Sequence, residues 1–310
     1  MKTVLVTGKI AEVGLRSLKE FAQVKVLENP TSELIAEGIA DADAVLHKIG
    51  KLTGKVLNKA KKLKIIARHG VGLDDIDLDY VRQQGIWLTI TVDANTNAVA
   101  EYTIGLILAA ARNIVSAHLD LSLRKKWDRE SLMGEELWGK TLGLIGYGKI
   151  GKRVAELVQS FGMRVVAYDP YSNNKIKGVE FLSLIDTVRK ADFLSIHCPL
   201  TEETRGLINS EVLSFMKPSA FLINTARGGI VEEETLIEVL ENHKIRGAAL
   251  DVYSLEPVDM RNRLLELDNV ITTPHIAAMS KQAQEKMAIM AADEIKRVLV
   301  EGQKPVFSVW

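Results

Sequence analysis

Residues 142–169 read LGLIGYGKIGKRVAELVQSFGMRVVAYD, and this stretch decides the fold of the chain around it. Its apolar beginning, residues 141–145, has the length and composition of a β-strand. Gly146, Gly148 and Gly151 follow in the spacing G-x-G-x-x-G, and apolar residues then recur at helical intervals. A second apolar run closes the stretch. The order of these parts predicts a strand, a tight glycine turn, a helix and a second, parallel strand.

This arrangement is typical of a dinucleotide site. Gly146 allows the tight turn, Gly148 lets the backbone approach a pyrophosphate, and Gly151 lets the helix pack closely on the strand. Free N–H groups at the start of the helix attract the phosphates. Asp169, at the tip of the second strand, can accept both ribose hydroxyls and repels a 2′-phosphate, so we predict NAD rather than NADP. The predicted NAD contacts in this stretch are Gly146, Tyr147, Gly148, Lys149, Ile150, Gly151 and Asp169.

The composition favours a cytoplasmic protein of two domains. The chain has 310 residues, with 40 lysine plus arginine and 40 aspartate plus glutamate, so its formal net charge is zero. A neutral chain argues against electrostatic capture of nucleic acid or of an anionic membrane. The one cysteine, Cys198, fits a reducing compartment. The N-terminus lacks the apolar region of a signal peptide, and residues 98–111 are too short to span a bilayer.

Short apolar runs alternate with helical patterns along most of the chain. Such alternation predicts parallel sheets covered by helices on both faces. We expect two doubly wound α/β domains: a Rossmann NAD-binding domain at 98–285, inserted in a flavodoxin-like substrate domain formed by 1–97 and 286–310. The expected strands cover residues 4–6, 24–27, 44–46, 65–67, 87–90, 141–145, 164–167, 193–196, 220–224, 247–251 and 270–272.

Residues 98–112 are apolar around nearly their whole helical circumference, which predicts a buried helix that joins two domains or packs on a partner. Residues 119–140 carry Trp127 and Trp138 among charges. Two interpretations of this segment are open: an arm lying across another surface, or a solvated helix with two anchoring aromatics. We expect a homodimer built on the dinucleotide domain.

Three polar residues follow expected strands in the second half: Arg227, Glu256 and His275. The carboxyl ends of parallel strands are where such folds expose their active sites. Arginine can hold a carboxylate or polarise a carbonyl, and histidine can shuttle a proton near neutral pH. A carboxylate beside the imidazole stabilises its charged form and fixes its orientation. Taken singly, each could be an unrelated polar loop residue, and no residue cluster points to a metal.

Seven stretches together resemble the D-isomer-specific 2-hydroxyacid dehydrogenase family over the whole chain. They are RHGVGLDDID at 68–77, AEYTIGLILAAAR at 100–112, GLIGYGKIGKRVA at 143–155, HCPLTEETRGLI at 197–208, INTARGGIVEEETL at 223–236, ALDVYSLEP at 249–257 and TPHIAA at 273–278. The resemblance implies an NAD-dependent oxidoreductase that acts on the CH–OH group of small 2-hydroxy acids or reduces the matching 2-oxo acids.

The resemblance also implies roles for single residues. Arg227 would bind the substrate, Glu256 would pair with the histidine, and His275 would be the general acid/base. The backbone amides of Val71 and Gly72 would hold the substrate carboxylate. The remaining implied NAD contacts are Asp251 near the nicotinamide carboxamide, Cys198, Pro199 and Thr204 on the adenine side, and His197, Thr225, Ala226 and His275.

The sequence departs from the family pattern in two places, and a third position argues against one branch of the family. Asp75 stands where asparagine is usual, and residues 92–93 replace a proline-containing turn. Neither belongs to the three candidate catalytic residues. Glu256 argues against formate dehydrogenases, which have glutamine there.

Within the family, residues 52–68 and the R-x-G-x-G-x-D stretch most resemble a short D-3-phosphoglycerate dehydrogenase without the C-terminal regulatory domain of longer forms. His47 and Lys48 stand where that group has an arginine that helps bind the substrate phosphate, and Lys48 can act only as a point charge. We expect His47, Lys48 and Arg68 to contact this part of the substrate. PHIAAMS at 274–280 resembles glyoxylate or hydroxypyruvate reductases instead.

A non-catalytic alternative is an NAD(H)-sensing binding protein, because the C-terminal-binding corepressors keep the same three residues. The chain lacks the long polar tails of those proteins, which favours an enzyme.

Overall fold

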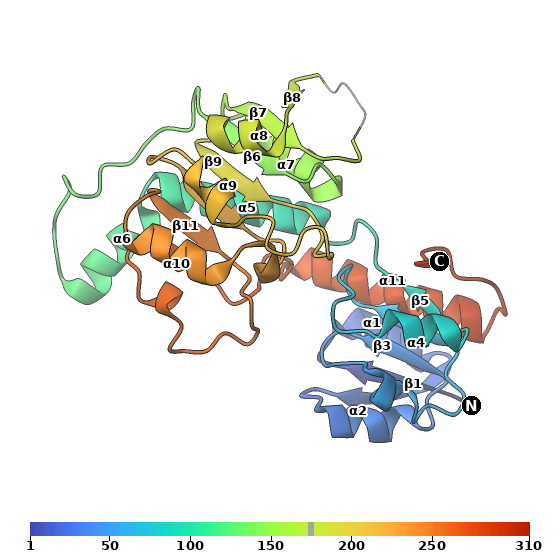
Figure 1. Cartoon of the computed structure of the whole chain (residues 1–310). Helices are drawn as coiled ribbons and strands as arrows, with labels where there is room; N and C mark the ends of the chain where they lie inside the picture. The colour runs from blue at the N-terminus through green and yellow to red at the C-terminus, as the bar shows by residue number, and fades with distance from the viewer. Residues whose placement is uncertain (173–176) are drawn as a thin grey trace. The chain divides into compact units, whose positions relative to one another are not determined.

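The structure is a computed structural model that describes residues 1–172 and 177–310. It divides into two compact units, which are described separately below. Unit 1 comprises Met1–Asn95 and Met279–Trp310, and unit 2 comprises Thr96–Ala278. Figure 1 shows that the last long helix returns the chain to the unit in which it began.

Unit 1 is built on a five-stranded parallel sheet in the order β2-β1-β3-β4-β5. The chain starts near one edge, adds β2 beside β1, and then builds outward on the other side, which is the flavodoxin-like order. The sheet therefore has the predicted fold. Its strands are β1 (Lys2–Thr7), β2 (Ala22–Leu27), β3 (Ala44–His47), β4 (Ile65–Arg68) and β5 (Trp87–Thr89).

Helices cover both faces of this sheet, because alternate residues of each buried strand point to opposite sides. Val4 and Val6 of β1 pack into a core with α11, whereas Leu5 between them packs into the core on the α2 side. The helices of unit 1 are α1 (Glu12–Lys19), α2 (Ser32–Ile39), α3 (Gly54–Leu57), α4 (Leu78–Gln83) and α11 (Lys281–Leu299).

Unit 2 is built on a seven-stranded parallel sheet in the order β12-β11-β10-β9-β6-β7-β8. The order reverses at β6, the strand that leads into the glycine turn, as in a Rossmann fold. The strands are β6 (Thr141–Ile145), β7 (Arg164–Tyr168), β8 (Val179–Phe181), β9 (Phe193–Ile196), β10 (Phe221–Asn224), β11 (Gly247–Leu250) and β12 (Val270–Thr272). β8 is not among the expected strands: its three residues have the charged and exposed Glu180 in the middle and so form no apolar run, unlike the equally short edge strands β5 and β12.

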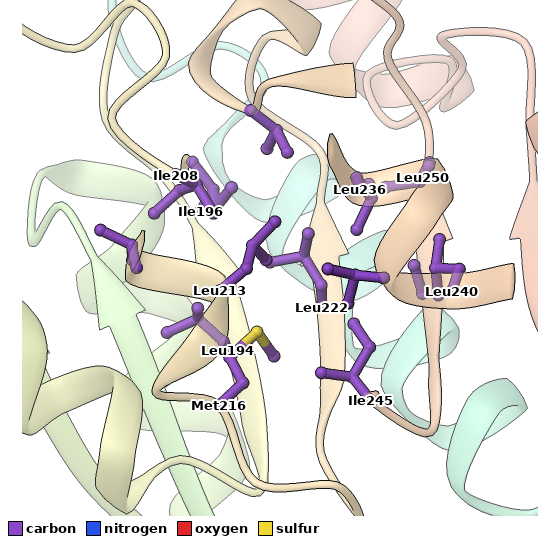
Figure 2. Packing of buried hydrophobic residues seen from close by; sticks show 14 of the residues in the cluster. Leu194, Ile196, Ile208, Leu213, Met216, Leu222, Leu236, Leu240, Ile245 and Leu250 are labelled. Carbon is purple, nitrogen blue, oxygen red and sulfur yellow. The ribbon is translucent and has the colours of Figure 1, made fainter. Parts of the chain in front are cut away.

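Two helical layers enclose the unit 2 sheet. One core lies between the sheet and the helices α5 and α7, and the other lies under α8, α9 and α10. In the second core, Leu194, Leu222 and Leu250 of three strands meet Leu213 and Leu240 of two helices (Figure 2). The unit 2 elements outside the sheet are α5 (Thr96–Ala111), α6 (Ile114–Leu119), the π-helix η1 (Asp120–Arg124), α7 (Lys149–Gln159), α8 (Leu184–Lys190), α9 (Ser210–Ser214), the 3-10 helix η2 (Gly228–Ile230), α10 (Glu233–Glu241) and the 3-10 helix η3 (Arg263–Leu265).

The helix expected over 98–112 is α5, and half of its residues are buried in unit 2. After α5 the chain forms an arm, residues 114–133, that projects from the rest of unit 2 (Figure 1), and Leu137 beyond it is buried in the unit 2 core. Trp127 in this arm and Trp138 after it are 80% and 78% exposed. Neither is an anchor of a solvated helix, because both lie in non-helical segments, and the Trp138 ring packs against Gly162.

The boundaries between the units differ from the predicted ones by a few residues. The sequence analysis placed them after residues 97 and 285, whereas unit 2 ends at Ala278. The shift has a local cause: the Ser280 hydroxyl accepts the N–H of Ala283 and so begins α11, which belongs to unit 1 as a whole.

Among the described residues, no single helix is long and apolar enough to cross a membrane. One bent pair, Thr96–Ala111 with Ile114–Arg124, passes the same test by length and composition only.

Candidate active site

The glycine turn after β6 is packed so tightly that two of its glycines are required. Gly146 has φ +95°, and a Cβ there would lie 2.6 Å from the Cys198 nitrogen. A Cβ on Gly151 would lie 2.4 Å from the Gly146 carbonyl oxygen. Only glycine fits both places, so the turn brings the start of α7 against the ends of β6 and β9.

The third glycine faces open space. A Cβ on Gly148 would meet no atom within 4 Å, and Gly148 caps α7 without any side-chain hydrogen bond. The first N–H groups of a helix have no intrahelical partner, and they carry the positive end of the helix dipole. Room, donors and dipole together fit the pyrophosphate of a dinucleotide.

Asp169 follows β7 and is fixed by the same turn. Its Oδ2 accepts the Tyr147 N–H at 2.7 Å, and its Oδ1 accepts the Tyr171 N–H at 2.9 Å. Each oxygen keeps a second lone pair for a ribose hydroxyl. The carboxylate is therefore held at the tip of the strand, where the sequence analysis placed it.

The segment after β9 lies against the glycine turn. The His197 N–H donates to the Ile145 carbonyl at 2.7 Å, and Thr204 closes the following loop by donating to the Pro199 carbonyl at 2.6 Å. Burial lowers the pKa of His197 to about 4 and raises the pKa of the Cys198 thiol to about 11. Both groups are therefore neutral at pH 7, and Cys198 is no nucleophile.

His275 and Glu256 form a hydrogen-bonded pair at the carboxyl edge of the unit 2 sheet. His275 Nδ1 lies 2.6 Å from Glu256 Oε2, and the other carboxylate oxygen accepts the Tyr253 N–H at 3.1 Å. Burial alone would raise the pKa of Glu256. The hydrogen bond and charge of His275, the Tyr253 N–H and the charge of Arg227 outweigh burial and lower it. An ionised Glu256 makes Nδ1 the donor, which leaves Nε2 as the ring nitrogen that Glu256 does not bind.

His275 is one of five non-glycine residues with positive φ among those described, at +53°. A left-handed backbone costs an L-residue about 1–2 kcal/mol, so the surrounding structure must hold it. Its side chain is 46% exposed, and that of Glu256 is 34% exposed. The imidazole is thus reachable from solvent while its backbone is constrained.

Arg227 lies in the loop after β10, next to the pair. Its Nη1 donates to the Ala226 carbonyl at 2.7 Å, and its charge is felt by Glu256. Thr225 turns inward, where its hydroxyl lies 2.9 Å from that of Thr103. The unit 2 sheet therefore brings Arg227, Glu256 and His275 together from three different loops, as expected from their positions after strands.

Asp251 does not lie where the family resemblance implied. Its carboxylate has no exposed surface and accepts three hydrogen bonds from residues 273–277. A direct contact with a nicotinamide carboxamide is closed to it in this structure.

Unit 1 carries the predicted substrate residues at the carboxyl edge of its own sheet. The N–H groups of Val71 and Gly72 donate to no acceptor among the described residues, so they are open to a carboxylate. Lys48 is half-buried, which lowers its pKa, and its Nζ donates to the Lys9 carbonyl and to Gln284 Oε1 at 2.6 and 3.0 Å. Arg68 Nη1 donates to Asp75 Oδ2 at 3.1 Å.

The prediction that His47 contacts the substrate is not supported. His47 has no exposed surface, and its two ring nitrogens lie 2.8 Å from Thr7 Oγ1 and 3.0 Å from Asp75 Oδ2. Burial and the charge of Arg68 lower its pKa despite the hydrogen bond to Asp75, so the ring is neutral. Its Nε2–H holds Asp75, and Asp75 in turn holds Arg68.

The sequence analysis did not find the partner Thr7, nor did it connect Asp75 with His47. One signal was available for the first: Thr7 and His47 end neighbouring strands and are register partners. The second depends on a loop 28 residues away, for which the sequence has no signal. Among the described residues, no group of three or more His, Cys, Asp or Glu side chains could hold a metal ion.

Comparisons with known proteins show the family to which the chain belongs. A family model described as "D-isomer specific 2-hydroxyacid dehydrogenase, NAD binding domain" matches residues 104–277. The solved structure of the TT0316 protein from Thermus thermophilus has a TM-score of 0.91 and 37% identity, covering 99% of this chain and all of that one.

Two curated relatives are equally similar in sequence. The D-3-phosphoglycerate dehydrogenase of Methanocaldococcus jannaschii is 43% identical over 304 residues, which cover 96% of this chain and 58% of that enzyme. The hydroxypyruvate reductase of Thermotoga maritima is 43% identical over 257 residues, which cover 82% of this chain and 84% of that enzyme. The chain thus spans little more than half the length of the first relative.

Proposed function

Because the chain belongs to the D-isomer specific 2-hydroxyacid dehydrogenase family, we propose that it oxidises a D-2-hydroxy acid, or reduces the matching 2-oxo acid, with NAD as cofactor. The observation that carries this proposal is the 2.6 Å pair of His275 and Glu256 beside Arg227, at the carboxyl edge of an NAD-binding sheet. Non-catalytic NAD(H)-sensing corepressors keep the same three residues, so turnover of NADH with a 2-oxo acid is the measurement that separates an enzyme from such a sensor.

Each residue of the site has a chemical task. NAD, when bound, supplies or accepts a hydride. His275 holds a proton at Nε2 for the substrate oxygen in reduction, and takes that proton back in oxidation. Glu256 stabilises the charged imidazole and fixes its ring. Arg227 binds the substrate through its planar fork, and the Val71 and Gly72 amides bind the carboxylate.

The substrate that we propose is D-3-phosphoglycerate, which would place the chain in serine biosynthesis. Support comes from the M. jannaschii relative and from Lys48 and Arg68, two cations at the carboxyl edge of unit 1. One observation favours glyoxylate or hydroxypyruvate instead. Asp75 places a carboxylate 3.1 Å from Arg68 Nη1, and His47 adds no charge, so fewer cations remain for a phosphate.

The test is a substrate panel of 3-phosphohydroxypyruvate, hydroxypyruvate, glyoxylate and pyruvate with NADH. The highest kcat/KM for 3-phosphohydroxypyruvate supports the proposal. A preference for hydroxypyruvate supports the alternative, and no turnover with any 2-oxo acid would overturn the function itself.

Asp75→Asn should raise kcat/KM for 3-phosphohydroxypyruvate relative to hydroxypyruvate, by roughly three- to tenfold. Removing a negative charge beside Arg68 favours a dianionic phosphate, and the effect of one partly exposed charge is modest. Asp79→Asn, which removes the same charge from the exposed first turn of α4, is the control. An unchanged ratio would show that Arg68 lies outside the phosphate subsite.

We propose further that the protein is a cytoplasmic homodimer built on unit 2 and that it contacts neither nucleic acid nor a membrane. The arm supports the dimer, because Trp127, Met133 and Leu123 expose 80%, 77% and 72% of their surface there. Exposed apolar groups gathered on one segment are typical of a protein interface.

Sedimentation at micromolar concentration should therefore show a dimer. Trp127→Asp should raise the dimer dissociation constant at least tenfold, because a carboxylate replaces an aromatic side chain that the dimer would bury. Met260→Asp is the matched control, since Met260 is 76% exposed elsewhere in unit 2. A wild-type monomer, or equal effects of both variants, would contradict an interface on the arm.

A further inference from the structure

Asp251 is a fully buried carboxylate directly under the loop that carries His275. It follows β11, and its Oδ1 accepts the Thr273 hydroxyl at 2.6 Å and the Ile276 N–H at 2.9 Å. Its Oδ2 accepts the Ala277 N–H at 2.8 Å. All three donors lie within two residues of His275, so the Asp251 side chain binds the loop both before and after His275 in the sequence.

Backbone carbonyls at the end of β11 and the Tyr253 hydroxyl bind the same loop. The His275 N–H donates to the Asp251 carbonyl at 2.8 Å, and the Thr273 N–H donates to the Leu250 carbonyl at 2.9 Å. The Tyr253 hydroxyl donates to the Thr273 carbonyl at 3.1 Å. Burial raises the pKa of Tyr253 to about 12, so this donor keeps its proton throughout the working range.

We propose that Asp251 is a positioning residue whose carboxylate holds the left-handed backbone of His275 and thereby aims the imidazole at the substrate. This inference rests on the proposed role of His275 as the acid/base. His275 at φ +53° needs an external constraint, and the hydrogen bonds that residues 273–277 donate to Leu250 and Asp251 supply it.

The hydrogen bonds that hold this loop require a carboxylate at position 251. Asp251 must accept with both oxygens at once, because Ile276 and Ala277 present N–H groups to different ones. Asparagine has the same shape but turns a donor NH₂ toward one of these N–H groups, whichever way the amide is oriented. The loop must then shift, and a misplacement on the order of 1 Å costs about a hundredfold in rate.

The experiment is a double-mutant cycle of Asp251→Asn and His275→Ala, with kcat for reduction and the Kd of NADH measured by fluorescence. Asp251→Asn should lower kcat roughly 10- to 100-fold in the wild-type background. In the His275→Ala background it should change the residual rate less than about twofold, because there is no imidazole left to aim. The Kd of NADH should stay within about threefold.

Two further variants keep the result interpretable. Asp192→Asn is the matched control: Asp192 also accepts a backbone N–H, that of Thr141 at 2.8 Å, but at the amino edge of the sheet, and kcat should not change. Thr273→Val removes one of the three donors, and it should lower kcat about three- to tenfold, and only where His275 is present. If Asp251→Asn does not fold, Thr273→Val takes its place in the double-mutant cycle.

The outcomes separate the two proposals. Full activity of His275→Ala alone would overturn the proposed function. If His275→Ala loses activity, and Asp251→Asn lowers kcat by the same factor in the His275→Ala background as in the wild type, only the positioning role is overturned. A rise in the Kd of NADH that matches the fall in kcat would mean that Asp251 serves the cofactor, and would also overturn it.

Discussion

Alanine in place of His275 is expected to lower kcat for 2-oxo acid reduction by roughly two to four decades, the usual contribution of a positioned general acid. The affinity for NADH should change much less than kcat, because His275 is one of many implied NAD contacts, and the glycine turn and Asp169 lie on other loops of unit 2. Stopped-flow kinetics with the best substrate of the panel measures the first quantity, and NADH fluorescence measures the second.

His243→Ala is the matched control for this variant. His243 is an exposed histidine of unit 2, and its backbone is also left-handed, with φ +48°. It follows α10 and contacts neither Glu256 nor Arg227 in the described residues. Equal losses of activity in the two variants would mean that the effect comes from the backbone conformation and not from the imidazole.

Glu256→Gln tests the partner of the histidine through the pH profile. The pKa of Glu256 is lowered, so the group is a carboxylate throughout the assay range. Reduction needs the protonated imidazole, so kcat/KM falls as pH rises and that proton is lost. Without the negative partner the proton is lost earlier, and this alkaline limb should move to lower pH. A limb that stays in place would make Glu256 a structural residue.

NADH is expected to exceed NADPH in kcat/KM by about two decades. The repulsion between a carboxylate and a negative charge of the 2′-phosphate about 5 Å away is roughly 3 kcal/mol at an effective dielectric constant of ~20. Each ~1.4 kcal/mol corresponds to a tenfold change in kcat/KM, so this repulsion gives about two decades. Asp169 is held firmly enough to exert this effect, because Tyr147 and Tyr171 N–H groups bind both of its oxygens. Rates with both cofactors over a range of concentrations measure the preference.

The double variant Asp169→Ala, Tyr171→Arg should narrow this preference to less than tenfold, since it removes the repelling charge and adds a cation two residues away. Tyr171 is 79% exposed and can be replaced without opening the core. Glu156→Ala removes the same charge from the neighbouring helix α7 and should leave the preference intact. Equal use of both cofactors by the wild type would contradict the assignment to Asp169.

The sequence by itself determined the elements that follow from local rules. The glycine spacing at 146–151 marks a tight turn in which only glycine fits at Gly146 and Gly151, and the apolar periods mark the buried strands on each side of it. Parallel strands with helical crossovers place every strand's carboxyl end at one edge. That rule was enough to bring Arg227, Glu256 and His275 to the same edge of unit 2, although they are far apart in the chain.

Only the tertiary structure decided which polar side chains face a ligand and which hold other residues in place. His47 ends β3 and Asp251 follows β11, so both lie at the carboxyl edge of a sheet as His275 does, yet both are fully buried and hydrogen-bonded within their units. Asp75, which binds His47, and residues 273–277, which bind Asp251, come from loops that lie more than twenty residues further along the chain. A side chain's exposure and its hydrogen-bond partners depend on how such distant segments pack, and no local period or spacing records that packing.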